Sequence, residues 1–325
     1  MIYCEWQKES EGEMRFKVGI VGAGNVGAET AREIQARQIA DVVLVDIIEG
    51  MPQGKGLDMS QSSAIYATSA RVYGSNDVAS VEGSDVVVIT AGVARKPGMS
   101  REDLLATNFR IVKGVCEQVK KYAPQAIVIM VTNPLDAMVY TAYRILQCEP
   151  NRIMGMAGVL DSARLRYFVA EEVGVSPANV QALVLGSHGD LMVPVPRFVS
   201  VSGIPAQDLI PEERMKALME RTQKGGGEIV ALLKTGSAYY APGVGITEMV
   251  ESILWDEKRL VSASVWAQGE YGLHDVFVGL PVVLGKNGVE KIVELPLTPE
   301  EKSALERSAR HVQNLQKEVD ALFAS

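Results

Sequence analysis

The sequence predicts an α/β protein in which a doubly wound parallel sheet is followed by a second domain of the α+β class. Strand-like and helix-like segments alternate from residue 16 to residue 131, as in a doubly wound sheet. Residues 85–90 and 126–131 are apolar almost throughout, as expected for strands buried on both faces. After about residue 150 the strand-like segments alternate more, which favours antiparallel pairing. We therefore expect an extension at residues 1–14 and domains at residues 15–150 and 151–325.

The elements of the first domain follow from apolar runs and turn residues. A glycine turn separates the first strand from the first helix, Pro52 suits the first turn of the second helix, and Ser100 with Asp103 reads as a capping box. We predict strands at residues 16–21, 42–45, 72–73, 85–90 and 126–131, and helices at residues 28–39, 52–67 and 100–122.

The second domain is expected to combine further strands with longer helices. A helical pattern at residues 211–233 contains three consecutive glycines from Gly225 to Gly227, which predict a kink or a break. Thr298, Pro299 and Glu301 mark the start of a final helix with an apolar stripe. Strands are predicted at residues 180–185, 197–202, 261–266 and 276–283.

Composition restricts the class of protein. The chain has 325 residues, of which 47% are hydrophobic and 22% charged, and its net charge is -8. This charge argues against nucleic acid as a partner, and no apolar run approaches the ~20 residues of a membrane span. Three cysteines without ligand-like spacing fit a reducing compartment, so we expect a cytoplasmic protein without a metal site.

A glycine motif near the N-terminus predicts a dinucleotide site in a Rossmann domain. Gly22 permits a tight turn, Gly24 lets a pyrophosphate approach the backbone, and Gly27 lets the helix pack closely on the strand. The helix N-terminus favours phosphate, and Asp46 after the second strand can bind ribose hydroxyls and would repel a 2′-phosphate. The motif therefore favours NAD over NADP. It reads Gly22-Ala23-Gly24-Asn25-Val26-Gly27.

Two segments carry candidates for acid–base chemistry. His188 lies in a glycine-flanked polar loop after an apolar strand, and its ordinary pKa of about 6.5 suits proton transfer near neutral pH. A solvated loop histidine is the alternative. Asp161 and Arg164 share a helical face, so the carboxylate could orient a histidine while the arginine grips a substrate carboxylate. Asp161 could equally be a helix cap.

Further polar residues follow two strands of the parallel sheet. Arg95 and Arg101 flank a Pro-Gly hinge, and Arg101 in a first helical turn opposes the helix dipole, which invites a functional interpretation. Asn133 follows a strand and could reach a substrate oxygen. Taken singly, these residues could also be solvated arginines and a turn asparagine.

Taken together, these segments resemble the lactate/malate dehydrogenase family, and most closely the lactate-dehydrogenase-like branch of its bacterial malate dehydrogenases. The resemblance covers the chain from about residue 15 to the last helix. Its segments are the glycine motif, Asp46, residues 95–101, Thr132-Asn133-Pro134, residues 160–164, Gly186-Ser187-His188-Gly189-Asp190 and Gly236-Ser237-Ala238-Tyr239-Tyr240.

The resemblance implies a role for each candidate. His188 would be the general base for the malate hydroxyl, with Asp161 holding its ring, while Arg164 would bind the carboxylate beside the reacting carbon. Arg101 would polarise the reacting carbonyl, and Asn133 would bind substrate near the nicotinamide. The cofactor site would comprise Gly22, Gly24, Asn25, Val26, Gly27, Asp46, Asn108, Val131 and Asn133.

The resemblance also implies the substrate. An arginine at position 95 would pair with the distal carboxylate of malate or oxaloacetate, whereas lactate dehydrogenases typically have glutamine there, and Ala238 leaves room for a dicarboxylate. The expected activity is NAD-dependent oxidation of (S)-malate to oxaloacetate, a step of the tricarboxylic acid cycle. The family forms homo-oligomers, and a tetramer is expected in preference to a dimer. The alternatives are a lactate or other 2-hydroxy-acid dehydrogenase, a catalytically inactive dinucleotide sensor and an NADP-preferring reductase.

Overall fold

The computed structural model describes residues 15–94 and 99–324, so the predicted extension at residues 1–14 lies outside the described residues. Its first half contains six parallel strands in the order β3-β2-β1-β4-β5-β6. This order is that of a Rossmann dinucleotide-binding sheet, and it confirms the predicted doubly wound α/β fold. The strands are β1 (Lys17–Val21), β2 (Asp41–Val45), β3 (Val72–Ser75), β4 (Val86–Ile89), β5 (Ile127–Met130) and β6 (Ile153–Gly155).

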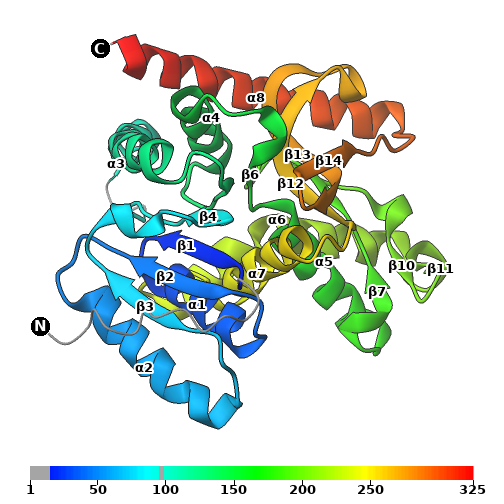
Figure 1. Ribbon diagram of the computed structural model, residues 1–325. Coiled ribbons are helices and arrows are strands. Elements are labelled where there is room, and N and C mark those ends of the chain that lie inside the picture. The colour runs from blue at the N-terminus through cyan, green and yellow to red at the C-terminus, as the bar shows by residue number, and fades with distance from the viewer. Residues whose placement is uncertain (1–14, 95–98, 325) are drawn as a thin grey trace, which may run out of the picture.

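Successive side chains of a strand point to opposite faces of the sheet, and in β4, β5 and β6 the side chains on both faces are buried. Ile20 and Leu44 pack with Ile34 of a helix on one face, whereas Val21 and Val43 pack in a cluster with helices on the other. Figure 1 shows the two helical layers, with α3 and α4 on one side of the sheet and α1 on the other. The bounds are α1 (Asn25–Ala36), α2 (Met51–Tyr66), α3 (Arg101–Tyr122) and α4 (Leu135–Leu146).

Antiparallel strands extend the same sheet beyond β6 in the order β12-β13-β8-β9, and β14 pairs with β13. The second half of the chain therefore continues the sheet of the first half. A separate three-stranded sheet has the order β11-β10-β7. The strands are β7 (Val180–Gln181), β8 (Val184–Gly186), β9 (Met192–Pro194), β10 (Ser200–Val201), β11 (Ile204–Pro205), β12 (Arg259–Gln268), β13 (His274–Gly285) and β14 (Gly288–Ile292).

Two strand predictions in the second half were wrong in detail. The predicted strand at residues 180–185 is two strands, β7 and β8, which belong to different sheets. The predicted strand at residues 197–202 begins instead with a 3₁₀ turn, Pro196–Phe198, and only Ser200–Val201 pairs. Pro196 has no N–H group to donate and a fixed φ, so it favours a turn over a ladder at this point.

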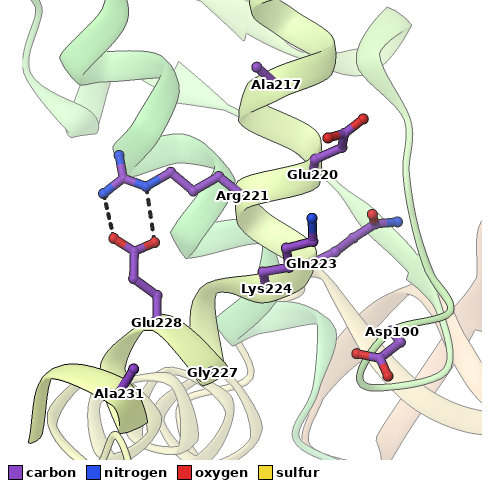
Figure 2. A pocket seen from close by; sticks show the side chains of 9 residues that line it. All are labelled: Asp190, Ala217, Glu220, Arg221, Gln223, Lys224, Gly227, Glu228 and Ala231. Atoms are coloured by element: carbon purple, nitrogen blue, oxygen red, sulfur yellow. Dashed lines mark hydrogen bonds and ion pairs between the residues drawn. The ribbon is translucent and has the colours of Figure 1, made fainter.

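The helices of the second half are α5 (Gly158–Val173), α6 (Glu212–Leu233), α7 (Tyr240–Leu254) and α8 (Pro299–Ala324). A break does not occur at Gly225 to Gly227, since α6 is one helix from Glu212 to Leu233. The predicted kink is seen in Figure 2, where the helix changes direction near Gly227. The predicted start of the last helix is confirmed. Thr298 Oγ1 accepts from the Glu301 N–H at 3.2 Å, and the Glu301 carboxylate accepts from the Thr298 N–H at 2.8 Å. α8 then runs along the top of Figure 1 above α4 and the antiparallel strands.

The strand order places ligands at one edge of the sheet. Chain connections leave β1 and β4 in opposite directions along the sheet. In open α/β sheets, ligands bind outside the carboxyl ends of the strands at such a point. The glycine motif follows β1, Asp46 follows β2 and Asn133 follows β5 by three residues, which brings all three to this edge. Across the described part of the chain, no helix has both the length and the apolar character of a membrane span.

Candidate active site

The glycine turn after β1 leaves the N-terminus of α1 open to an anion. Gly22 has φ +113°, and a side chain at Gly27 would lie 1.9 Å from the Gly22 carbonyl oxygen. Gly24 is the N-cap residue of α1, offers no side-chain cap and faces open space, and the first turn carries no acidic residue. The helix end therefore has free N–H groups and a partial positive charge available to a pyrophosphate. Asn25 is exposed and Val26 half-buried at the same turn.

Asp46 lies beside this turn with its carboxylate fixed. Its Oδ2 accepts from the Ala23 N–H at 2.7 Å, and its Oδ1 accepts from the Ile48 N–H at 3.0 Å. The side chain is only partly buried, so its remaining lone pairs can accept from ribose hydroxyls. The residues of the turn, the helix end and this acid fit a dinucleotide without a 2′-phosphate.

Asn108 and Asn133 connect the loops that follow β4 and β5. The Asn108 side chain is fully buried; its Oδ1 accepts from the Val93 N–H at 2.8 Å, and its Nδ2 donates to the Asn133 carbonyl at 2.6 Å. Nδ2 also donates to the Val93 carbonyl at 3.1 Å. Asn108 therefore holds the two loops together, while Asn133 is exposed and Val131 half-buried beside them. Direct contact of Asn108 or Val131 with cofactor stays a prediction.

A single carboxylate, Asp161, joins the two other candidates from the second half. Its Oδ2 lies 2.9 Å from Nδ1 of His188, and its Oδ1 accepts from Nη1 of Arg164 at 3.0 Å. The carboxylate is 2% exposed, whereas the His188 and Arg164 side chains are 20% and 13% exposed. Asp161 and Arg164 are three residues apart on α5, so the helix places their side chains next to each other on one face. Within the described part of the chain, Nε2 of His188 has no hydrogen-bond partner.

The charges around His188 favour its protonated form. Burial by itself lowers the pKa of this imidazole, but the charge and hydrogen bond of Asp161 and the charge of Asp136 raise it. Arg164 opposes them, and the net result is a pKa above the ordinary value. An imidazole held in this way can take a proton and keep it.

The remaining candidates are less closely tied to this group. Arg101 opens α3 behind the capping box of Ser100 and Asp103, which confirms its predicted place, and its Nη2 lies 3.5 Å from Asp190 Oδ2. Both side chains of that pair are exposed. Arg95 lies outside the described residues. Ala238 is half-buried shortly before α7.

A cavity of about 680 Å³ opens between the loop after His188 and α6 (Figure 2). Asp190 lines it from the loop, and a two-bond ion pair between Arg221 and Glu228 lines it from α6, at 2.8 and 3.1 Å. Its lining includes none of His188, Asp161 and Arg164, so it is a neighbour of the candidate site. Among residues 15–94 and 99–324, no group of three or more His, Cys, Asp or Glu side chains could hold a metal ion.

Sequence reasoning missed two contacts of the site. Asp136 at the start of α4 accepts from the backbone N–H of His188 at 3.1 Å. On α6, a side chain at Gly225 would lie 3.2 Å from Cδ of Arg164, so this glycine lets the helix approach the arginine. A carboxylate in an otherwise apolar helix segment was the available signal for Asp136. The run of glycines at Gly225 was interpreted only as a kink or a break in the helix.

Comparisons with known proteins show the family to which the chain is similar. Residues 16–155 match the family model described as lactate/malate dehydrogenase, NAD binding domain. Residues 158–324 match the model described as lactate/malate dehydrogenase, alpha/beta C-terminal domain. The chain is 54% identical to a malate dehydrogenase of Thermomicrobium roseum over 302 residues, which is 93% of this chain and 97% of that protein. It is 51% identical to a malate dehydrogenase of a Roseiflexus species over 92% of this chain and 97% of that protein.

Solved structures show the same likeness. Malate dehydrogenase from Picrophilus torridus in its apo form has a TM-score of 0.93 and 44% identity, covering 96% of this chain and 99% of that one. Lactate dehydrogenase from Cryptosporidium parvum, complexed with lactic acid and nicotinamide adenine dinucleotide, has a TM-score of 0.91 and 42% identity, with coverages of 95% and 99%. The chain therefore belongs to the lactate/malate dehydrogenase family.

Proposed function

We propose that the protein catalyses the reversible NAD-dependent oxidation of (S)-malate to oxaloacetate. The observation that carries this proposal is the pair of bonds from one buried carboxylate, Asp161, to the His188 imidazole and the Arg164 guanidinium. These groups supply a proton acceptor and a carboxylate receptor side by side. The names of the relatives at 51–54% identity support malate as the substrate.

Each residue of the site has a chemical task in this proposal. His188 Nε2 takes the hydroxyl proton of malate as the C2 hydride leaves, and it returns the proton in the reverse direction. Asp161 fixes the ring through Nδ1 and stabilises the imidazolium that forms. Arg164 binds the carboxylate next to C2 with N–H groups not used by Asp161. Arg101 supplies positive charge to the reacting carbonyl, and Asn133 contacts substrate near the nicotinamide.

The cofactor is proposed to lie across the carboxyl edge of the parallel strands. The open N-terminus of α1 would hold its pyrophosphate, and Asp46 would hold the ribose beside it. When bound, NAD accepts the hydride. The protein supplies position and charge, while the hydride chemistry belongs to the cofactor.

Arg95 is proposed to select the dicarboxylate. The fold cannot make this distinction, because a malate dehydrogenase structure and a lactate dehydrogenase structure match it with TM-scores of 0.93 and 0.91. An arginine can pair with the distal carboxylate of oxaloacetate, whereas the methyl group of pyruvate offers a cation no partner. Substrate choice therefore depends on this residue more than on the scaffold.

The test compares NADH oxidation at 340 nm with oxaloacetate and with pyruvate, with NADPH as the control cofactor. We expect strong preference for oxaloacetate with NADH. In Arg95→Gln, turnover of oxaloacetate should fall by about 100-fold or more, because a charge-assisted pair is lost, while pyruvate turnover should not fall. Equal losses on both substrates would refute the selecting role. Tight NADH binding without any turnover would favour the inactive-sensor alternative.

Gly225 provides a test of the role of Arg164. An added methyl group at Gly225 would meet Cδ of Arg164 at 3.2 Å, so the guanidinium must shift by a few tenths of an ångström. We expect Gly225→Ala to raise KM for oxaloacetate by about threefold to tenfold with a smaller change in kcat, since displaced positioning groups weaken substrate binding.

Gly227→Ala is the matched control, because a methyl group there meets nothing within 4 Å. Both substitutions favour the helix by roughly 1 kcal/mol, so a difference between them reports contact with Arg164 rather than helix propensity. Equal KM values in the two variants would contradict the proposed contact.

We further propose that the protein is a cytoplasmic homo-oligomer, a tetramer in preference to a dimer, acting in the tricarboxylic acid cycle. Large apolar side chains on α2 support the oligomer: Leu57 is 49% exposed and Ile65 is 87% exposed. Tyr240 and Val244 on α7 are exposed as well. Exposed apolar residues gathered on helices are typical of subunit contacts. Analytical ultracentrifugation measures the number of subunits, and a monomer at micromolar concentration would overturn the proposal.

A further inference from the structure

The buried carboxylate of Asp136 contacts the loop that carries His188 from the side of α4. It lies in the first turn of α4 and is 4% exposed. Its Oδ2 accepts from the backbone N–H of His188 at 3.1 Å, and its Oδ1 accepts from Ser264 Oγ of β12 at 2.7 Å. The chemistry assigned to His188, Asp161 and Arg164 does not use this group.

A second contact fixes the neighbouring residue of the same loop. The backbone N–H of Ser187 donates to Ser308 Oγ of α8 at 2.7 Å, and Ser308 Oγ donates to Ser187 Oγ at 3.1 Å. Gly186 has φ +83°, and a side chain there would lie 2.8 Å from Ser308 Oγ. Two successive N–H groups of the loop are therefore held by side chains of two different helices.

Asp136 also brings a charge close to the imidazole. Within the described part of the chain, the charged groups with the largest effects on His188 are Asp161 and Arg164 of α5 and Asp136 of α4. Burial raises the pKa of Asp136, and the charge of Asp161 raises it further. The hydrogen bonds from Ser264 and from the His188 N–H, together with the charge of His188, lower it. The net result is a pKa above the ordinary value. Both hydrogen bonds are donated to its oxygens, and such bonds stabilise the charged form of a carboxyl group.

We propose that Asp136 is a positioning residue for His188, which fixes the backbone of the loop and adds a second negative charge that stabilises the imidazolium. The inference rests on the proposed function in one respect, the acid–base role of His188. Asp161 holds the ring at one edge, and Asp136 holds the main chain of the same residue. His188 would thus be held by two carboxylates, one bonded to its ring and one to its main-chain N–H.

Asp136→Asn separates charge from shape. Asparagine has the same size, its Oδ1 can still accept from the His188 N–H, and its amide can donate to the Ser264 hydroxyl. The chain has only three histidines, so ¹³C-histidine NMR can follow the titration of His188 directly, with His188→Asn to identify its signal. We expect the titration midpoint of His188 to move to lower pH in Asp136→Asn, because a neighbouring negative charge is removed.

The pH profiles of activity should move in the same direction as the His188 titration. Malate oxidation requires neutral His188, so its acid limb should move to lower pH. Oxaloacetate reduction requires protonated His188, so its alkaline limb should also move to lower pH. Maximal turnover should fall by less than about tenfold, because Asp161 still orients the ring.

Ser308→Ala is the control that removes a backbone contact of the loop without changing charge. It should lower turnover and leave the His188 titration in place. Asp136→Ser provides a second uncharged variant, with a hydroxyl that can accept a hydrogen bond, should the asparagine variant not fold. An unchanged His188 titration in the Asp136 variants would overturn the electrostatic role. Since NMR needs no substrate, absence of malate turnover in the wild type would refute the proposed function without affecting this result.

Discussion

Replacement of His188 with asparagine is expected to reduce oxaloacetate turnover by about 10³-fold to 10⁴-fold while NADH binding is retained. Asparagine has no ring nitrogen, so the proposed acceptor of the hydroxyl proton is lost. Its amide can still form a hydrogen bond with Asp161, so the buried carboxylate at 2% exposure keeps a partner. The loop should keep its place as well, since the contacts at the Ser187 and His188 N–H groups belong to the backbone.

The measurement is NADH fluorescence titration together with steady-state turnover. His274→Asn is the matched control, because His274 is an exposed residue at the start of β13 and belongs to none of the contacts of the site. We expect its turnover to match that of the wild type. Near-normal turnover in His188→Asn would remove this residue from the mechanism, whereas loss of NADH binding would indicate a damaged fold.

The parallel half of the fold could be predicted from sequence because its signals are local. Residues 86–89 and 127–130 are continuous apolar runs, and the glycine turn with Asp46 has a fixed spacing relative to β1 and β2. The capping boxes at Ser100 and Thr298 also lie within four residues of the helices that they start. Such patterns specify an element without reference to the remainder of the chain.

Contacts between distant segments could not be predicted in this way. Asp136 and His188 are 52 residues apart, and Ser187 and Ser308 are 121 apart, so no local pattern relates them. The glycines of α6 show the same limit. In sequence they indicate a kink or a break, because glycine weakens a helix. In the structure the helix turns near Gly227 without breaking, and Gly225 is buried against Arg164. Tertiary packing therefore decides whether a glycine interrupts a helix or allows another side chain to pack closely against it.

Replacement of Arg164 with lysine is the second substitution with a large expected effect. Nη1 of the guanidinium donates to Asp161 at 3.0 Å, and the side chain is 13% exposed. The other N–H groups lie in the same plane and can donate to both oxygens of a carboxylate. Lysine keeps the charge but presents a single nitrogen, which cannot satisfy Asp161 and grip a carboxylate with two parallel bonds.

We expect kcat/KM for oxaloacetate to fall by about 100-fold in Arg164→Lys, since a hydrogen bond to a charged group contributes roughly 1.5–3 kcal/mol. Most of the loss should be in KM, because the carboxylate is bound before and during hydride transfer alike. Arg166→Lys is the matched control: it lies on the same helix, but its Nε donates to the Val180 carbonyl at 2.8 Å, away from the site. A loss confined to kcat would mean that Arg164 acts through Asp161 on the histidine instead of binding substrate. A second test adds free guanidinium to the Arg164→Ala variant. If Arg164 does not bind substrate, the added guanidinium will not lower the KM of this variant.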